Sequence, residues 1–329
     1  MRVVVTRRIP EPALELLGGS HDVWLSPHDR PMTTDELHAA VQGADAAVTL
    51  LHDRVDGAFL DAAGPGLRVV ANVAVGYDNI DLAACAERGV IATNTPGVLT
   101  EATADLAFAL LLMATRRLGE GERLVRAGHT WSWSMFFMLG TGIQDKLLGI
   151  VGLGQIGAAT ARRARAFGMQ VAYTGRRRAG PDVERELDAR WVESLDELLA
   201  ISDVVSLHCP LTPETHHLID ARRLGLMRRQ AYLVNTTRGP VVDEAALVEA
   251  LRTGVIAGAG LDVFEREPGV HPGLFELDNA VLLPHLGSAT IETRTAMGVL
   301  AARNALAVLA GDPPLTPIPL AVSGTAPGA

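Results

Sequence analysis

Three glycines near the middle of the chain have the spacing of a loop that binds phosphate. The segment Leu148-Gly-Ile-Val-Gly152-Leu-Gly154-Gln-Ile-Gly157 starts in an apolar stretch and leads into a helical pattern over 158–167. In such a loop Gly152 permits the tight turn, Gly154 lets the backbone approach a pyrophosphate, and Gly157 lets helix and strand pack closely. The helix then offers free N–H groups and its positive dipole end to the phosphates.

Glycine-rich turns also occur as purely structural elements, so the flanking strand and helix decide between the two interpretations. Both flanking elements are predicted here, and we therefore expect the loop to bind a dinucleotide. The residues expected to contact it are Gly152, Gly154, Gln155, Ile156 and Gly157.

The strand after this helix is followed by basic residues. The segment reads Tyr173-Thr-Gly-Arg176-Arg177-Arg178, whereas an NAD-binding strand normally ends in an acidic residue that binds the ribose 2′-OH. Arginines pair well with a 2′-phosphate through charge-assisted hydrogen bonds, although such a triplet can also be a solvated loop. We predict that Arg176 and Arg177 contact the cofactor and favour NADP(H), with NAD(H) still usable.

Short β-branched stretches alternate with helical patterns along the chain. The predicted strands lie at 3–6, 46–51, 67–75, 90–94, 148–151, 170–174, 204–208, 231–235, 257–263 and 281–283. Several of them are apolar without alternation, as expected when helices cover both faces of a sheet. This order predicts an α/β fold with parallel sheets built from βαβ units. The strongest helix prediction is Glu101–Arg117, which has acidic residues in its opening turns and Arg116 and Arg117 at its far end.

Length and charge limit the class of protein. A chain of 329 residues indicates two domains, and a net charge of -9 argues against a nucleic-acid partner. The apolar run 106–114 is far shorter than the ~20 residues that cross a bilayer, and the N-terminus has no signal-peptide pattern. We therefore expect a cytoplasmic protein without a membrane partner.

The cysteines and the clustered histidines do not have the spacing of metal ligands. Cys85 and Cys209 give no disulfide framework, which suits a reducing cytosol. His208, His216 and His217 lack matching carboxylate or cysteine ligands, so no metal site is expected.

Several segments occur in an order that resembles the D-isomer-specific 2-hydroxyacid dehydrogenases, most closely the glyoxylate/hydroxypyruvate reductase branch. Besides the glycine loop they are Asn72-Val-Ala-Val-Gly76-Tyr-Asp-Asn-Ile-Asp81, Asn94-Thr-Pro-Gly, Thr100-Glu-Ala-Thr-Ala-Asp-Leu-Ala, His208-Cys-Pro-Leu-Thr-Pro-Glu-Thr, Asn235-Thr-Thr-Arg238-Gly-Pro-Val-Val-Asp243, Gly260-Leu-Asp-Val-Phe-Glu-Arg-Glu267-Pro and Leu283-Pro-His285-Leu-Gly-Ser-Ala-Thr. The resemblance extends from roughly Asp45 to Ala310. It implies two Rossmann-like parallel-sheet domains, with the cofactor domain inserted into a discontinuous substrate domain.

The resemblance also sets the expected domain boundaries. Residues 1–98 would form the first part of the substrate domain, and 99–287 would form the dinucleotide-binding domain. Residues 288–329 would return to the substrate domain and end in a loose C-terminal tail rich in proline, glycine and small residues.

The implied catalytic residues are His285, Glu267 and Arg238. Hydride reduction of a ketone leaves negative charge on the oxygen, so a proton donor is needed. His285 would donate that proton, Glu267 would keep the imidazole protonated, and Arg238 would bind the substrate carboxylate and polarise the keto oxygen. Taken alone, each could be an ordinary loop residue, and the family resemblance decides for function.

Further contacts follow from the same resemblance. Backbone N–H groups of Val75 and Gly76 would complete the carboxylate site, and Leu51 would lie over the substrate, although it could equally be core. Asp262 would accept from the nicotinamide carboxamide, but it could instead cap the turn that follows its strand. The remaining expected cofactor contacts are Thr103, Pro210, Thr215, Thr236 and Gly287.

The implied activity is reduction of small 2-keto acids such as glyoxylate, hydroxypyruvate or 2-ketogluconate to 2-hydroxy acids. A dinucleotide-sensing, corepressor-like binding protein is the alternative from another class, and another 2-hydroxyacid or a phosphite dehydrogenase is the alternative within the fold. We also expect a homodimer, with Glu101–Arg117 and the aromatic segment 128–142 in the interface. Trp133, or its neighbour Trp131, would reach the partner's active site, although these aromatics could instead fold back on their own subunit.

Overall fold

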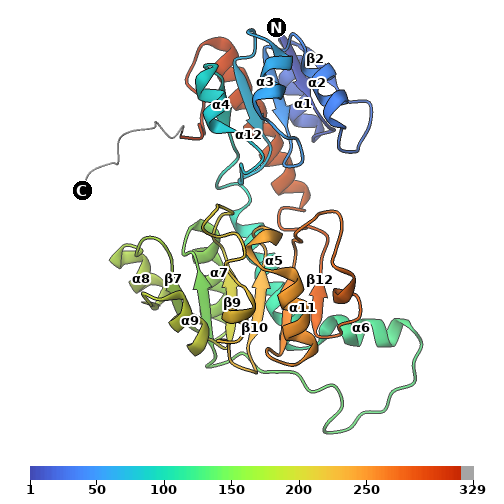
Figure 1. Ribbon diagram of the computed structural model, residues 1–329, viewed down its shortest axis with the longest axis vertical. Coiled ribbons are helices and arrows are strands. Elements are labelled where there is room, and N and C mark those ends of the chain that lie inside the picture. Colours follow the sequence, from blue (N-terminus) through green and yellow to red (C-terminus); the bar gives the residue numbers. More distant parts are fainter. Residues whose placement is uncertain (320–329) are drawn as a thin grey trace. The chain divides into compact units, whose positions relative to one another are not determined.

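The computed structural model describes residues 1–319, and the chain divides into two compact units. Unit 1 combines Met1–Leu99 with the segment that begins at Thr290, and unit 2 spans Thr100–Ala289. Each unit is built around one fully parallel sheet with helices on both faces (Figure 1). The predicted fold class, two parallel-sheet α/β domains, is therefore confirmed. The end of the expected loose tail, 320–329, lies outside the described residues.

Unit 1 contains a five-stranded sheet in the order β2-β1-β3-β4-β5. Its strands are β1 (Arg2–Val5), β2 (Asp22–Leu25), β3 (Ala46–Thr49), β4 (Val69–Asn72) and β5 (Ile91–Thr93). Its helices are α1 (Glu11–Gly18), α2 (Thr34–Val41), α3 (Gly57–Ala63), α4 (Leu82–Glu87) and α12 (Ile291–Ala310). Successive residues of β1 face opposite sides: Val4 packs with α2, α3 and α4, while Val3 and Val5 pack with α1 and α12.

Unit 2 contains a seven-stranded sheet in the order β12-β11-β10-β9-β6-β7-β8. Its strands are β6 (Leu147–Val151), β7 (Gln170–Thr174), β8 (Ala189–Trp191), β9 (Val204–Leu207), β10 (Tyr232–Asn235), β11 (Gly258–Leu261) and β12 (Ala280–Leu282). Its helices are α5 (Thr100–Thr115), α6 (Leu118–Arg126), α7 (Gln155–Ala166), α8 (Pro181–Leu187), α9 (Leu195–Ile201), α10 (Ala221–Leu224) and α11 (Glu244–Arg252), with short 3-10 turns η1 (Gly239–Val241) and η2 (Pro272–Leu274).

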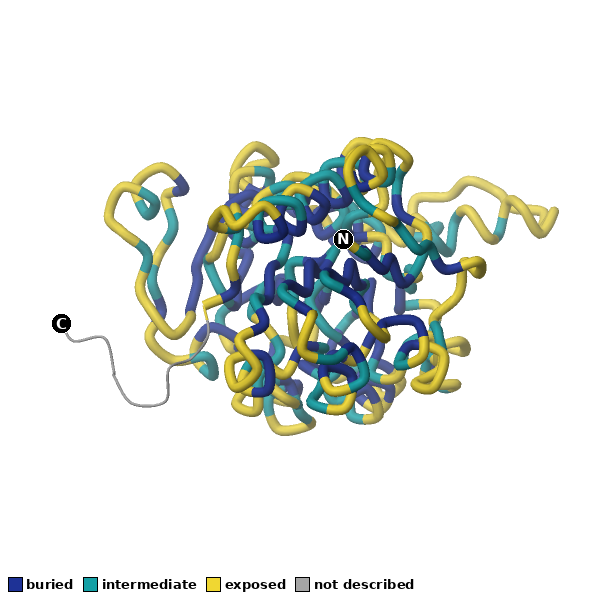
Figure 2. Tube along the Cα trace, turned by 90° about the horizontal axis from the view of Figure 1, so that it is seen from above, coloured by how far each residue is buried: buried dark blue, intermediate teal, exposed yellow. Residues whose placement is uncertain are grey.

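The two faces of the unit 2 sheet have separate cores. Helices α5 and α7 pack on one face, and α9, α10 and α11 pack on the other. Residues of the central strands β6, β9, β10 and β11 are almost all buried, and Figure 2 shows exposed stretches mainly on the outside of the chain trace. The chain leaves β6 for β7 and β8 and then returns to β9 on the other side of β6. Ligands of such sheets bind at the carboxyl ends of the strands where this reversal occurs.

The structure corrects the sequence prediction at the sheet edges and at one helix end. Strands β2 and β8 were not predicted; both are short edge strands with no buried residue. The helix predicted to end at Arg117 ends at Thr115, because Arg117 adopts a left-handed conformation with φ of 56° and precedes α6.

Two features bear on the expected environment. Within residues 1–319, no helix is both long and apolar enough to traverse a lipid bilayer. In the same residues, no group of three or more His, Cys, Asp or Glu side chains is arranged as a potential metal site.

Candidate active site

The glycine loop lies between β6 and α7 at the point where the sheet order reverses. Gly152 has a φ of 97°, and a Cβ atom there would lie 3.0 Å from the carbonyl carbon of His208, directly after β9. At Gly157 a Cβ would lie 2.4 Å from the carbonyl oxygen of Gly152. Both positions therefore require glycine, and α7 is held close to the preceding turn.

The amino end of α7 has the features of a phosphate site. Its N-cap is Gly154, which supplies no side chain to cap the first-turn N–H groups. A Cβ at Gly154 would meet no other described atom within 4 Å. Uncapped donors beside an open space fit the pyrophosphate of a dinucleotide, and the residues predicted to bind it, including Gln155 and Ile156, lie in this turn.

The three arginines after β7 have different surroundings. Arg178 donates to both carboxylate oxygens of Glu184 at 2.8 Å, and the Tyr173 hydroxyl donates to the same carboxylate. These bonds hold the pKa of Glu184 at about 2, below its usual value. Arg176 and Arg177 are exposed and form no ion pair within residues 1–319. Arg178 therefore anchors the loop, and the other two guanidinium groups remain available to a ligand.

Two buried polar atoms at neighbouring strand ends have no hydrogen-bond partner in the described chain. They are Nδ1 of His208 and Oγ1 of Thr236. Leu207 pairs with Asn235 across β9 and β10, so His208 and Thr236 follow side by side at the carboxyl edge of the sheet. Because buried polar groups nearly always have partners, these two atoms fit contacts to a polar ligand such as a ribose.

The electrostatic state of His208 agrees with such a contact. Its Nε2 is hydrogen-bonded to Ser206 Oγ at 2.8 Å, and burial lowers the pKa of His208 to about 4. The imidazole is therefore neutral near pH 7, and its second nitrogen can face a ligand without placing a buried charge there.

The loop after β12 is fixed by Asp262. The Asp262 carboxylate, 1% exposed, accepts from the N–H groups of Leu286 at 2.7 Å and Gly287 at 2.8 Å. The Thr103 hydroxyl on α5 donates to the carbonyl of Gly287 at 3.0 Å. Burial raises the pKa of Asp262, and the two N–H groups oppose that rise. Asp262 and Thr103 thus position the loop that carries His285; their contacts with a cofactor remain predictions.

His285 and Glu267 meet through a direct hydrogen bond. Nδ1 of His285 lies 2.8 Å from Oε2 of Glu267, and the N–H of Phe264 donates to the other Glu267 oxygen at 3.1 Å. His285 has a left-handed φ of 55° and donates its N–H to the Asp262 carbonyl. Its side chain is 29% exposed. Since Nδ1 is engaged, Nε2 is the nitrogen available to a substrate.

Arg238 lies on a turn that packs against the loop carrying Glu267. The N–H of Val241 donates to the Arg238 carbonyl, and Arg238 Nη1 donates to the Thr237 carbonyl at 2.9 Å. A Cβ at Gly239 would lie 1.8 Å from the carbonyl carbon of Phe264. Only glycine allows this approach, which brings the Arg238 turn against the backbone three residues before Glu267.

Leu51, Val75 and Gly76 lie in unit 1, on the loops that follow β3 and β4. The Asp53 carboxylate shapes the first loop by accepting from Leu50 N–H at 2.8 Å and from the Thr6 hydroxyl, and burial raises the pKa of Asp53. The structure therefore places these three residues at the carboxyl edge of the unit 1 sheet.

Thr215 is engaged within its own loop. Its hydroxyl donates to the Pro210 carbonyl at 2.7 Å and accepts from the N–H of Thr212 at 2.7 Å. Thr215 thus organises the loop after β9, on which Pro210 is exposed.

Some positioning residues were missed by sequence reasoning. Asn235 accepts from Thr237 N–H at 3.0 Å and donates to the Arg238 carbonyl at 3.0 Å; an asparagine at a strand end before a turn is its local signal. Glu244 and Glu265 each accept the other's backbone N–H, at 2.8 and 2.9 Å. That pair has no local signal, because Glu244 begins helix α11 whereas Glu265 lies on the loop after β11, 21 residues further along the chain.

Comparison with known proteins decides the family. A sequence profile described as "D-isomer specific 2-hydroxyacid dehydrogenase, NAD binding domain" matches residues 108–287. The chain belongs to the D-isomer specific 2-hydroxyacid dehydrogenase family. The resemblance is thereby confirmed, and the protein is an NAD(P)-dependent oxidoreductase.

Relatives extend the similarity over nearly the whole chain. The glyoxylate reductase of Thermococcus onnurineus (strain NA1) is 49% identical over 320 residues, covering 96% of this chain and 95% of that protein. A crystal structure of a Thermus thermophilus protein is 47% identical with a TM-score of 0.90, covering 97% of this chain and 100% of that chain. The NADPH-dependent glyoxylate/hydroxypyruvate reductase of Sinorhizobium meliloti, solved with NADP and malonate, is 35% identical with a TM-score of 0.84, covering 96% of each chain.

Proposed function

We propose that this protein reduces small 2-keto acids to 2-hydroxy acids with NADPH as the hydride donor. The observation that carries the proposal is the 2.8 Å contact between His285 Nδ1 and Glu267, which leaves Nε2 available for proton transfer. Residues 99–287 would form the dinucleotide-binding domain, and 1–98 with the segment from 288 would form the substrate domain. Relatives named glyoxylate reductase support glyoxylate as the first substrate to test, followed by hydroxypyruvate and 2-ketogluconate.

Each catalytic side chain has a distinct task in this reaction. The bound nicotinamide would supply the hydride to the keto carbon. His285 gives the Nε2 proton to the keto oxygen, so that hydride and proton together convert the carbonyl into an alcohol. Glu267 stabilises the imidazolium before the transfer. Arg238 holds the substrate carboxylate and polarises the keto oxygen as its charge develops.

The NADPH preference rests on the loop after β7. Arg176 and Arg177 follow β7, after which folds of this kind recognise the cofactor ribose, and Arg178 is already paired with Glu184. The Sinorhizobium meliloti relative was solved with NADP, which supports the same cofactor here.

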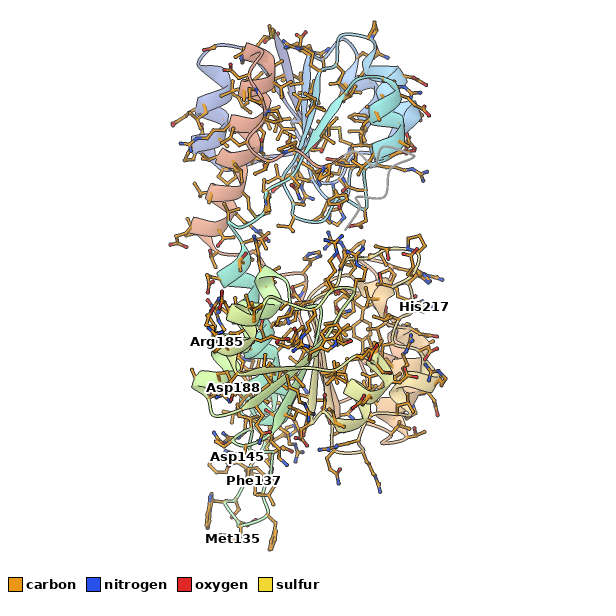
Figure 3. All side chains as sticks on the ribbon, turned by 90° about the vertical axis from the view of Figure 1, so that its left-hand side faces the viewer. Met135, Phe137, Asp145, Arg185, Asp188 and His217 are labelled. Carbon is orange, nitrogen blue, oxygen red and sulfur yellow. The ribbon has the colours of Figure 1, made fainter. Side chains whose placement is uncertain are left out.

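The homodimer proposal rests on the segment 128–142 after α6, which we term the arm. Figure 1 shows it extending away from the sheet of unit 2, and Figure 3 shows Met135 and Phe137 on it. Trp133 is 74% exposed and Phe136 84% exposed, a rare concentration of exposed aromatics. Helix α5 contributes less free surface, because most of its apolar residues are buried within unit 2.

Sedimentation tests the dimer directly. At low micromolar concentration the wild type should have dimer mass, and Phe136→Asp should weaken association about tenfold or more, as expected when an interface anchor is lost. Trp133→Ala should change the KM for the 2-keto acid if this side chain reaches the partner's site. A fully active wild-type monomer would end the proposal.

Steady-state oxidation of NADPH and NADH with each 2-keto acid tests the activity. We expect turnover with glyoxylate and a higher kcat/KM with NADPH than with NADH. Dinucleotide binding without turnover of any 2-keto acid would contradict the proposal and favour a dinucleotide-sensing binding protein.

A further inference from the structure

Two side-chain amides in unit 1 hold consecutive carbonyl groups of the loop after β4. Nδ2 of Asn94 donates to the Val75 carbonyl at 2.8 Å. Nδ2 of Asn72 donates to the Gly76 carbonyl at 3.1 Å. Asn72 is fully buried and Asn94 half-buried, so both amides are fixed parts of the domain.

Backbone bonds hold the carbonyl groups on either side of this pair. The Ala74 carbonyl accepts from Thr95 N–H at 2.8 Å, and the Tyr77 carbonyl accepts from Ile80 N–H at 3.0 Å. Four carbonyl groups in a row, 74–77, are therefore anchored within unit 1.

Anchored carbonyls determine where the neighbouring N–H groups point. In a planar trans peptide the C=O of one residue and the N–H of the next point in opposite directions, and the only cis peptide in the described chain is Glu267–Pro268. The N–H groups of Val75, Gly76 and Tyr77 are thus directed away from the anchors. None of the three has a hydrogen-bond partner within residues 1–319.

Asn94 is itself held in place by Thr316, which follows α12 in the C-terminal part of unit 1. The Thr316 hydroxyl donates to the Asn94 carbonyl at 2.6 Å, and Asn94 N–H donates to the Thr316 carbonyl at 3.3 Å. Thr316 is in turn bound by Asn304 of α12 at 2.7 and 2.9 Å. This chain of bonds fixes the amide of Asn94 before any ligand arrives.

We propose that Asn94 and Asn72 are positioning residues that aim the N–H groups of Gly76 and Tyr77 at the carboxylate of the 2-keto acid. Preorganised N–H donors stabilise an anion without adding a buried cation. Tyr77 thereby supplies a donor beyond those predicted at Val75 and Gly76. The identity of the anion rests on the proposed function, whereas the orientation of the donors follows from unit 1 alone.

The test exchanges the amide donor for an acceptor of the same shape. Asn94→Asp should repel the Val75 carbonyl and turn the Gly76 N–H away, and Asn94→Ser should lose the bond without repulsion. We expect the glyoxylate KM to rise about tenfold or more in Asn94→Asp, as for a lost bond to a charged group, and less in Asn94→Ser. Both kcat and the NADPH KM should stay within about twofold, because no catalytic or cofactor contact is removed.

A matched control separates positioning from general destabilisation. Asn279→Asp removes amide donation to the Leu251 and Ala257 carbonyls, each at 3.2 Å, in unit 2. It should lower Tm without raising the glyoxylate KM. The proposal is overturned if folded Asn94→Asp keeps the wild-type glyoxylate KM. It is equally overturned if kcat falls and both KM values rise to an extent that follows the fall in Tm.

Oxamate binding separates this inference from the proposed activity. Oxamate presents a carboxylate next to a carbonyl, and calorimetry on the NADPH-saturated protein needs no turnover. Suppose that the wild type binds oxamate, that Asn94→Asp binds it about tenfold more weakly, and that the wild type turns over no 2-keto acid. The proposed function would then be wrong, and the positioning role of Asn94 would stand. Failure of the wild type to bind oxamate, or equal binding by both proteins, would overturn the positioning role.

Discussion

The loops at the carboxyl edges of the two parallel sheets are built in opposite ways. In unit 2, the Asp262 carboxylate accepts from two backbone N–H groups and so fixes the loop that carries His285, whose side chain contacts Glu267. In unit 1, the side-chain amides of Asn72 and Asn94 fix the loop, and backbone N–H groups remain.

We relate this difference to the task proposed for each region. A proton transfer needs a titratable side chain that can lose and regain its proton. Holding a carboxylate needs only fixed donors, which the backbone supplies once its carbonyls are anchored. The two loops differ in which backbone groups a side chain holds: N–H groups beside His285 in unit 2, and the carbonyl groups of Val75 and Gly76 in unit 1.

The largest expected effect comes from removing the proposed proton donor in unit 2. His285→Ala should lower kcat by about two to four orders of magnitude, the usual contribution of a general acid. The NADPH KM should be unchanged, because the glycine loop is untouched. Steady-state kinetics across pH would check this. A wild-type kcat and pH optimum in the variant would show that another group donates the proton.

Cofactor choice should depend on the two unpaired arginines. Replacing Arg176 and Arg177 with serine should raise the NADPH KM about a hundredfold, since each lost charge-assisted bond is expected to cost about tenfold. The NADH KM should change little. Initial rates with both cofactors give the answer, and an equal loss with both would contradict a role in recognising the 2′-phosphate.

A smaller effect should follow from removing the partner of His285. Glu267→Gln should lower kcat about tenfold, which is less than the loss expected when the general acid itself is removed. The loss is expected because the imidazole no longer has the carboxylate that contacts its Nδ1 at 2.8 Å, and steady-state kinetics with glyoxylate would measure it. A wild-type kcat in the folded variant would show that Glu267 does not support proton transfer by His285.

The smallest effect should come from replacing Glu184, which anchors the loop after β7 through its ion pair with Arg178. Its pKa is lowered to about 2 from 4.5, so its stabilising contribution is complete above about pH 4.5 and is lost as the pH falls towards 2. Glu184→Gln should therefore lower Tm slightly above pH 5, and the difference from the wild type should shrink on acidification. A Tm difference that does not change between pH 7 and pH 3 would contradict this contribution.

The sequence alone predicted the central strands and the glycine loop, because both carry local signals. Strands β2 and β8 were not predicted, because edge strands bury too few side chains to show an apolar pattern in the sequence. The pairing of Glu267 with His285, 18 residues apart, came only from family resemblance. The amide-to-carbonyl bonds of Asn72 and Asn94 could not be predicted, since single polar contacts leave no periodic pattern.

The most direct test compares oxamate binding with kcat for glyoxylate in two variants, His285→Ala and Asn94→Asp, each saturated with NADPH. It asks whether carboxylate binding and proton transfer can be lost separately. His285→Ala should bind oxamate within about tenfold of the wild type while kcat falls at least a hundredfold. Asn94→Asp should show the reverse, with weaker binding and a nearly unchanged kcat. Loss of binding and kcat together in both variants would contradict the separation of carboxylate binding from proton transfer.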